Sequence, residues 1–592
     1  MVTNWRDEDT ERIILDDISL DEPWALVERF SHIVRLSGSP EEQEAVRYIT
    51  DKLSGWGVPY QVHKPVCLIS LPGPATLRTV GPNGRSYTVK TSSFSPSTDG
   101  KELTAELVYV PGSQASGIND LFGVHRTVST QDLHGKIVMT EGLGIAARGI
   151  DLAGSGAVGA VFINPGQRIH EGITTTSWGS PDLNQLGRIP PVPVFGINKP
   201  DGEALKAALQ EGPVTIAVSN KVETSWRPIP VIVAEIAGNQ AADEFVLFHG
   251  HLDSWHEGIG DNATGDATLL ELARVFHKHR DRLARTLRVA WWSGHSHGRY
   301  AGSTWYADTF AQDLTANCVA HVNCDSPGCR WATVYHDVFF MAEAEGIVKA
   351  SVKDVTGQEA TGGRPLRAGD CSFNNLGIST FFMLSSTMPE ELVKEKGYYA
   401  VGGAGGNIAW HTEDDTMQIA DRDNLLRDMK VYAVALVRTL NSPIYPLDYR
   451  AAVAQITSDL NRYQAAAGGA FDFSPALHAA GELNTTLDRF YTEADSLMDR
   501  EVDDPAVRQI NASQRLLARS LVSVNYSQDG RFRQDPARSI PPLPDIAPAT
   551  DLAKEPAGSD RYYVLRTHLT RGQNRVVWSL RQAERRIAER IQ

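Results

Sequence analysis

The amino-acid sequence predicts an α/β protein whose mixed, mostly parallel sheet is flanked by helices and interrupted by a β-rich insertion. The first observation is the apolar run 245–248, which ends in a polar loop and is followed by apolar residues at helical spacing over 269–276. The second is a series of short β-type runs, separated by Gly, Pro and Ser, between about residues 71 and 227. The third is a set of long helical patterns beyond Pro443. We therefore expect an α/β domain, an inserted domain and a C-terminal helical domain.

The N-terminal segment predicts the first helices of the α/β domain. Apolar residues recur at helical spacing after Glu22 and Pro23, until the sequence SGSP interrupts the pattern. Pro40 begins a second helix and Gly57 follows its end, because Pro suits the first helical turn and Gly the residue after the last. A strand-like run, VPYQVHKPVCLI, comes next. The expected domains are residues 1–66 with 228–445 for the α/β part, 67–227 for the insertion and 446–592 for the helical part.

Length and composition exclude several classes of protein. The chain has 592 residues, too many for one core, and its net charge of −15 comes from 72 acidic and 57 basic residues without a Lys/Arg block. This balance argues against a nucleic-acid-binding surface. The start lacks the apolar segment of a signal peptide, and no charge-free apolar run reaches 18 residues, so we expect a soluble, cytoplasmic protein without membrane contact. Five cysteines without CxxC spacing predict neither a disulfide framework nor a cysteine zinc site.

Potential metal ligands follow several of the predicted strands. In an open α/β sheet, ligands bind at the carboxyl ends of the strands, where the loops of neighbouring strands converge. His and Asp together suit a divalent cation, whereas each residue alone would be an ordinary loop residue. Convergence at one edge of the sheet therefore predicts a single metal site. The candidate ligands are His251, Asp261, His297, Asp325 and His411.

Several motifs resemble the co-catalytic zinc aminopeptidase family, and the domain order resembles its glutamate carboxypeptidase II and transferrin receptor branch. The motifs are HLDSWHEGIGDNATG, YAGSTWYAD, HVNCDSPG and WHTEDDT, with GKIVMTEG in the insertion. The resemblance implies a zinc aminopeptidase-like fold, an inserted protease-associated domain and a homodimer formed through the C-terminal helices. It also implies one or two divalent transition metal ions. Zinc is favoured by the family, while Fe, Mn, Co and Ni suit the same ligands.

The resemblance assigns roles to individual residues. His251 and Asp325 correspond to ligands of the first ion, Asp261 to the bridging carboxylate and His411 to a ligand of the second ion. Asp253 corresponds to the carboxylate behind the metal-bound histidine, which fixes its tautomer.

The chain departs from the family at a Glu-Glu pair that supplies a general base and a ligand. A gapless count back from Gly302-Ser303 places this pair on Ser296 and His297. His297 can replace the ligand, but a serine hydroxyl is no proton acceptor near neutral pH, so ordinary aminopeptidase activity should be weak or absent. The candidate catalytic residues are therefore His295, Ser296 and Asp253, with His256, Glu257 and Glu413 as other possible bases on neighbouring loops.

The family places a pocket-lining loop before the strand-like run 378–384, which here is the segment 364–377. It holds Arg364, Arg367 and Asp370 as candidate substrate-binding residues. A guanidinium that points inward would favour an anionic substrate, and the alternative is that both arginines are solvated.

We expect a metal-dependent hydrolase that uses metal-activated water on an amide or related C–N bond of a small or peptide-like substrate. Two alternatives stay open at the level of the sequence. The first is a metal enzyme of altered chemistry, such as a lyase or a cyclising transferase, because Ser-His changes both the base and the charge of the site. The second is a non-catalytic binding protein on the same fold.

Overall fold

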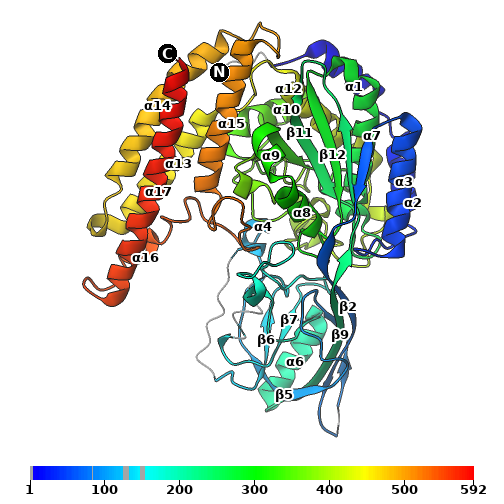
Figure 1. Ribbon diagram of the computed structural model, residues 1–592. Helices are drawn as coiled ribbons and strands as arrows, with labels where there is room; N and C mark the ends of the chain where they lie inside the picture. Colours follow the sequence, from blue (N-terminus) through cyan, green and yellow to red (C-terminus); the bar gives the residue numbers. More distant parts are fainter. Residues whose placement is uncertain (1–4, 83, 124–131, 147–151, 153, 592) are drawn as a thin grey trace.

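The computed structural model describes residues 5–82, 84–123, 132–146, 152 and 154–591 (Figure 1). Figure 1 shows three parts: an α/β body, a second sheet below it, and a group of long C-terminal helices to its left. Two stretches with sequence-based expectations are partly outside the described residues: the N-terminal start, of which residues 1–4 are not described, and AGSGAVGAVFINPG, which begins at residue 153. The α/β class, the β-rich insertion and the C-terminal helices are confirmed.

The central sheet of the α/β body has six strands in the order β1-β10-β12-β11-β13-β14. Strands β12, β11, β13 and β14 are parallel, while β1, β10 and β12 pair antiparallel, so the sheet is mixed. The carboxyl ends of the parallel strands therefore lie at one edge. The strands are β1 (Tyr60–His63), β10 (Val231–Ile236), β11 (Ala241–His251), β12 (Arg285–Trp292), β13 (Cys318–Asn323) and β14 (Ser379–Phe381).

Helices cover both faces of this sheet because the central strand β11 is apolar on both sides. Val246 and Phe248 pack into the large core formed with α7 (Thr264–Lys278) and α12 (Arg422–Asn441). Phe245 and Leu247 point to the other face, into a core formed with α8 (Ala301–Thr309) and α9 (Ala311–Asn317). A strand buried on both faces reads as a continuous apolar run, which is the pattern that predicted it. Helices α10 (Glu345–Thr356) and α11 (Glu390–Lys396) complete this body.

The N-terminal helices are α1 (Glu8–Asp17), α2 (Asp21–Phe30) and α3 (Pro40–Trp56). The predicted start and end of the helix at Pro40 are confirmed. The hydroxyl of Ser39 accepts the amide of Glu42 at 3.0 Å and caps the first turn. Gly57 ends the helix with φ 73°, a left-handed conformation that glycine adopts at little cost.

The insertion forms a second, barrel-like sheet of eight strands in the order β3-β2-β9-β5-β6-β7-β8-β4. Two long antiparallel strands, β2 (Val66–Thr79) and β9 (Thr215–Pro228), carry the chain from the α/β body into this sheet and back (Figure 1). Helix α6 (Lys199–Glu211) and the short α4 (Ile118–Leu121) belong to the same part. Its other strands are β3 (Ser86–Tyr87), β4 (Val89–Thr91), β5 (Leu103–Tyr109), β6 (Ile137–Glu141), β7 (Gly159–Ile163) and β8 (Val194–Ile197).

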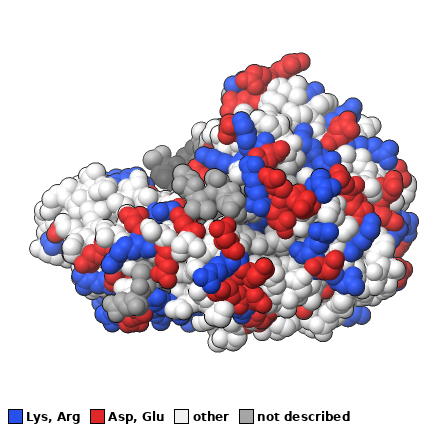
Figure 2. Space-filling model, turned by 90° about the horizontal axis from the view of Figure 1, so that it is seen from above, with Lys and Arg blue, Asp and Glu red and all other residues white. Residues whose placement is uncertain are grey.

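The C-terminal part consists of α13 (Tyr449–Ala467), α14 (Ser474–Asp495), α15 (Pro505–Asn525), α16 (Ala549–Leu552) and α17 (Asp560–Ile591). The loop between α15 and α16 reaches the inserted sheet, where Arg188 pairs with Asp529 at 2.7 Å. Among the described helices, none combines the length and apolar character that a membrane span requires. On the face shown in Figure 2, the described Lys and Arg side chains are interspersed with Asp and Glu.

Candidate metal centre

The candidate ligands come from loops at the carboxyl edge of the parallel strands. His251 is the last residue of β11, His295 follows β12 by three residues, and Asp325 follows β13 by two. Asp261 lies in the short turn η2 (Ile259–Ala263) between β11 and α7, and His411 follows the glycine-rich loop. The predicted convergence of strand ends therefore takes place in the folded chain.

Asp261 lies between two histidines. One of its carboxylate oxygens, Oδ1, is 2.9 Å from Nε2 of His251, and the other, Oδ2, is 3.1 Å from Nε2 of His411. The two ring nitrogens thus face opposite oxygens of one buried carboxylate. This is the arrangement that a carboxylate shared by two metal positions requires.

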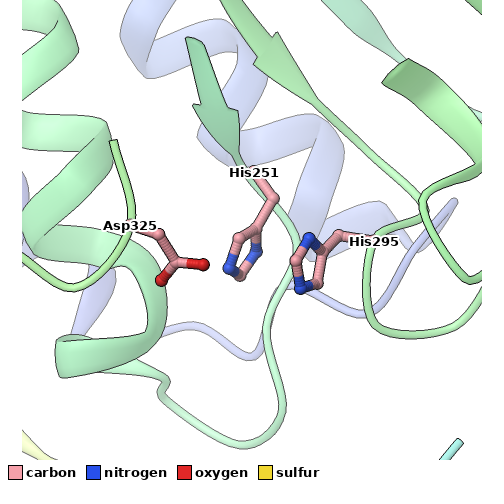
Figure 3. A group of neighbouring side chains, drawn as sticks. All are labelled: His251, His295 and Asp325. Atoms are coloured by element: carbon pink, nitrogen blue, oxygen red, sulfur yellow. The ribbon is translucent and has the colours of Figure 1, made fainter. Parts of the chain in front are cut away.

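A second group brings His251 together with His295 and Asp325. Potential ligand atoms of these three side chains all lie within 4.8 Å of one another, and all three residues are buried. The rings of His251 and His295 are stacked, with centroids 3.8 Å apart and planes at 17°. Figure 3 shows the carboxylate of Asp325 directed at the ring of His251, with the ring of His295 on the other side. His295, which the sequence offered as a possible base, thus lies among the candidate ligands.

Each of the three histidines has its second ring nitrogen held by an oxygen. Nδ1 of His251 is 2.9 Å from the carbonyl of Asp253, and Nδ1 of His411 is 3.0 Å from the carbonyl of Glu171. Nδ1 of His295 is 2.7 Å from Oδ2 of Asp370. A hydrogen bond at Nδ1 leaves Nε2 as the basic nitrogen, which is how metal-binding histidines are commonly oriented. The residues present therefore fit a divalent ion.

The pKa shifts at this group support the same conclusion. Burial lowers the pKa of His251, but the carboxylate of Asp261 outweighs burial and raises it well above the ordinary value. Burial raises the pKa of Asp261, but the hydrogen bonds from His251 and His411 outweigh it and hold it well below the ordinary value. Burial and the charge of Asp261 raise the pKa of Asp325. Positive charge is thus strongly favoured between these side chains, and a metal ion supplies it in place of a proton.

The remaining residues of the GHSHG segment have other contacts. The ring of His297 is fully buried, with Nδ1 at 2.9 Å from the hydroxyl of Ser37 and its centroid 4.1 Å from that of Trp255. Its Nε2 has no hydrogen-bond partner among the described residues, and the histidine is not part of the group around His251. The amide of Ser296 donates to Oδ2 of Asp253 at 2.8 Å. The ligand role predicted for His297 and the place of Ser296 among the candidate catalytic residues stay predictions.

The carboxylate of Asp253 supports the loop that carries His295. It accepts the amides of His295 and Ser296 and the hydroxyl of Ser37, the last at 2.7 Å. His251, in contrast, contacts the main-chain carbonyl of Asp253 and not its carboxylate. The carboxylate therefore fixes the loop, while the backbone of the same residue orients the histidine.

The predicted substrate-binding segment lies close to the site but directs its arginines elsewhere. Arg364 donates to the carbonyl of Asn525, and Arg367 donates to the carbonyls of Cys371 and Asp535. Asp370 instead binds His295 and accepts the hydroxyl of Ser303 at 2.5 Å. Of the three predicted residues, only Asp370 contacts a side chain of the candidate metal centre.

The other possible bases are engaged in ion pairs or exposed. Nε2 of His256 lies 3.1 Å from the carboxylate of Glu171, and Glu413 pairs with Lys90 and Arg168. The side chain of Glu257 is partly exposed, and its carbonyl accepts Arg35.

Two buried residues that sequence reasoning did not identify hold the loop between His251 and Asp261. Arg35 donates to the carbonyls of Leu252, Glu257 and Gly258 at 2.8–3.0 Å. Asp415 accepts the amides of Gly260 and Asp261 at 2.7 and 3.1 Å, and burial raises the pKa of Asp415 to about 7. The only sequence signal was position: Arg35 stands in the N-terminal motif RLSGSP, and Asp415 follows His411 in HTEDD.

A cavity of about 40 Å³ lies at the centre, lined by Asp261, His295, Asp325 and His411, by Arg299, and by apolar side chains that include Phe122 and Trp410. A larger cavity of about 560 Å³ shares Asp325 and Leu384 with it. The larger volume is in the range of small-molecule sites. Arg299 is a third residue that the sequence did not single out.

Comparisons with known proteins agree with the fold. Residues 231–436 match the description of peptidase family M28. The chain is 22% identical over 504 residues to probable glutamate carboxypeptidase VP8 of Zea mays, an alignment that covers 73% of this chain and 68% of that protein. In structure it resembles a peptidase M28 precursor from Shewanella amazonensis SB2B, with a TM-score of 0.55, 20% identity, and 74% and 96% of the two chains covered. It also resembles BSAP, a zinc aminopeptidase from Bacillus subtilis, with a TM-score of 0.52, 19% identity, and 71% and 94% covered.

The matched residues 231–436 contain β10 to β14, the loops between them, and all the residues of the candidate metal centre. The likeness to solved structures extends beyond this region and supports the fold. Residues 231–436 thus match peptidase family M28, and the chain has distant homology to the glutamate carboxypeptidases.

Proposed function

We propose that this protein is a metal-dependent hydrolase that cleaves an amide or related C–N bond of a small or peptide-like substrate. The observation that carries the proposal is the buried group of two histidines and one carboxylate, His251, His295 and Asp325. Catalytic zinc sites commonly have three protein ligands of this kind and keep one position for water. The family match and the large adjoining cavity support a hydrolytic reaction at this centre.

His251, His295 and Asp325 would hold the first ion through two Nε2 atoms and a carboxylate oxygen. Asp261 lies beside His251 and would contribute its Oδ1 to the same ion. Zinc is proposed because histidine and carboxylate donors suit it, and Fe, Mn, Co and Ni are candidates with the same donors. When bound, the ion polarises a carbonyl oxygen and lowers the pKa of a water ligand towards ~7.

Asp370 would orient His295, since its carboxylate accepts the Nδ1 proton and leaves Nε2 directed at the site. The hydroxyl of Ser303 donates to the other oxygen of Asp370, so this carboxylate is itself held in place. A histidine ligand is neutral where a carboxylate ligand would be negative, which leaves one positive charge more on the centre. A more positive centre favours ionisation of bound water and partly compensates for the missing glutamate base.

Asp261 and His411 define a choice between one and two ions. With a single ion, Oδ2 of Asp261 would stay 3.1 Å from Nε2 of His411, as it is in the structure. With two ions, Asp261 and His411 would be the residues that hold the second. Metal stoichiometry separates these two arrangements.

The other parts of the molecule have proposed roles that follow the family resemblance. The inserted sheet would act as a protease-associated domain over the site, since the carbonyl of Glu171 in this part holds His411. The C-terminal helices would form a homodimer, because α17 exposes the large side chains Tyr563, Val564 and Trp578. Exposed apolar residues of this size on one helix are common at subunit interfaces.

The experiment is metal analysis of the purified protein together with a hydrolysis screen. Elemental analysis should find one or two transition metal ions per chain. A mass-spectrometric screen of dipeptides, N-acyl amino acids and aminoacyl anilides should find turnover that a chelator abolishes and zinc restores, with aminoacyl anilides among the poorest substrates. A protein that binds no transition metal after reconstitution, or whose turnover ignores the chelator, would contradict the proposal. A product formed without uptake of water would instead support a lyase or a cyclising transferase.

A further inference from the structure

Arg299 is a buried arginine at the candidate metal centre. It follows the GHSHG segment, has 4% of its surface exposed, and lines the same cavity as Asp261, Asp325 and His411. Its guanidinium carbon lies 5.3 Å from the ring centroid of Tyr300. The position is therefore inside the site and not on its rim.

The guanidinium of Arg299 lacks an acidic partner among the described residues. Its Nε is buried and makes no hydrogen bond with any of them, and neither a salt bridge nor a side-chain hydrogen bond of this residue occurs in the described part of the chain. Buried arginines are almost always paired, because an unpaired buried charge costs several kcal/mol. A buried arginine without an acidic partner is suited to pair with an acidic group of a bound ligand.

The backbone also holds Arg299 in a constrained conformation. Arg299 and Tyr300 have φ values of 50° and 69°, in the left-handed region that non-glycine residues rarely adopt. Such conformations persist where the surroundings enforce them, commonly at functional sites. Here the carbonyl of Arg299 accepts the amide of Gly179 from the inserted part at 2.6 Å. The fold therefore fixes this residue at the wall of the cavity.

The charges that line the cavity leave a positive excess once an ion is bound. Asp261 and Asp325 are its acidic residues, Arg299 is its basic residue, and the histidines are neutral when they bind metal through Nε2. One divalent ion balances the two carboxylates, so the charge of Arg299 is left over. The apolar walls, which include Ile145, Ile173 and Met383, weaken solvent screening.

We infer that Arg299 binds a carboxylate of the substrate, so that the substrate is an acid whose carboxylate lies close to the bond that is cleaved. The inference rests on the proposed function, since the metal ions define the place of that bond. A guanidinium presents two parallel N–H donors that match the planar carboxylate. The carboxylate would lie in the small central cavity beside Arg299, and the rest of the substrate would occupy the 560 Å³ cavity.

The test measures binding of simple acids to the zinc-loaded, full-length protein by calorimetry. Succinate, glutarate and adipate are compared with their monoamides, because one carboxylate of each can bind the metal and the second is then available for Arg299. The variants are Arg299→Gln, Arg299→Lys and, as a matched control, Arg168→Gln, whose exposed guanidinium pairs with Asp414 outside this cavity. Zinc content and melting temperature are measured for every variant.

The unmodified protein should prefer at least one diacid over its monoamide by roughly 30-fold or more, as expected for a buried charge pair. Arg299→Gln should lose this preference and keep its zinc, Arg299→Lys should retain part of it, and Arg168→Gln should retain all of it. Equal binding of diacid and monoamide to the unmodified protein, or an unchanged preference in Arg299→Gln, would overturn the inference.

Two further outcomes are decisive. If Arg299→Gln fails to fold, the test rests on Arg299→Lys. A lysine variant that binds the diacids as tightly as the unmodified protein would rule out a contact made by the two parallel N–H donors of Arg299. If 4-phosphonobutyrate binds more tightly than glutarate, the site prefers phosphate-type anions and the carboxylate assignment is wrong. If the unmodified protein binds zinc and hydrolyses substrates but shows no preference for diacids, this inference alone is refuted. If the unmodified protein neither binds zinc nor hydrolyses any substrate, the proposed function is refuted.

Discussion

Replacement of Arg35 by lysine should weaken metal binding although Arg35 contacts no candidate ligand directly. Arg35 is fully buried, and its guanidinium donates to three carbonyls of the loop that joins His251 to Asp261. Lysine keeps the charge, but its single ammonium cannot reach three carbonyls that the planar fork spans. Hydrogen bonds from a charged group contribute about 1.5–3 kcal/mol each, so the loss of two costs about 3–6 kcal/mol.

Most of this cost should appear as disorder of the loop and as a lower free energy of unfolding of the protein. The effect on zinc affinity should be smaller, because substitutions of residues that support metal ligands typically lower metal affinity roughly 10–100-fold. Zinc affinity is measured by competition with a chromophoric chelator, and stability by the melting temperature of the zinc-free protein. The control is Arg29→Lys, since Arg29 forms an exposed ion pair with Glu44 on the same N-terminal segment and such pairs contribute about 0–1 kcal/mol. Zinc affinity within twofold of the unmodified protein in Arg35→Lys would refute this reasoning.

Four further predictions concern the metal centre and the assembly. Asp261→Ala should remove most of the bound metal, measured by elemental analysis, because this carboxylate lies between His251 and His411. His295→Ala should lower zinc content while His297→Ala keeps it, and the opposite result would restore the ligand role first predicted for His297. The affinity for zinc should still rise with pH above 6.5. Asp261 outweighs burial and raises the pKa of His251, so that a proton competes with zinc for this ring past that value. A zinc affinity that stays constant over about pH 6 to 8, measured by competition with a chelator, would contradict this. Light scattering at micromolar concentration should show a dimer that Trp578→Glu dissociates, and a monomeric unmodified protein would exclude this interface.

The central elements of the fold could be predicted because each has a local cause. Continuous apolar character marks β11 as a strand covered on both faces, and the structure packs alternate residues of that strand against different helices. Pro40 and Gly57 mark the two ends of α3 through the backbone conformations that these residues favour. Convergence of His251 and Asp325 could be predicted as well, because parallel neighbours β11 and β13 end at the same edge.

The choice between His295 and His297 could not be made from spacing. The count back from Gly302-Ser303 assumes that the chain between this pair and the predicted ligand has the usual path. In the structure, Arg299 and Tyr300 both adopt left-handed conformations just before α8, and the carboxylate of Asp253 holds the amides of His295 and Ser296. The side chain of His295 therefore stacks on His251, while that of His297 packs against Ser37 and Trp255. Which histidine binds metal is left to the paired variants.

The same limit applies to the arginines, because the sequence does not show which groups each guanidinium contacts. Burial does not distinguish Arg364, Arg367 and Arg299 as candidate anion-binding residues, since all three are largely buried. The distinction comes from residues more than 150 positions away. The carbonyls of Asn525, the last residue of α15, and of Asp535, in the segment after it, accept the first two guanidiniums. Those arginines therefore join the helical part to the α/β body, and Arg299 is the one of the three whose guanidinium has no hydrogen-bond partner among the described residues. A substrate carboxylate is the partner that its position beside the metal ligands favours.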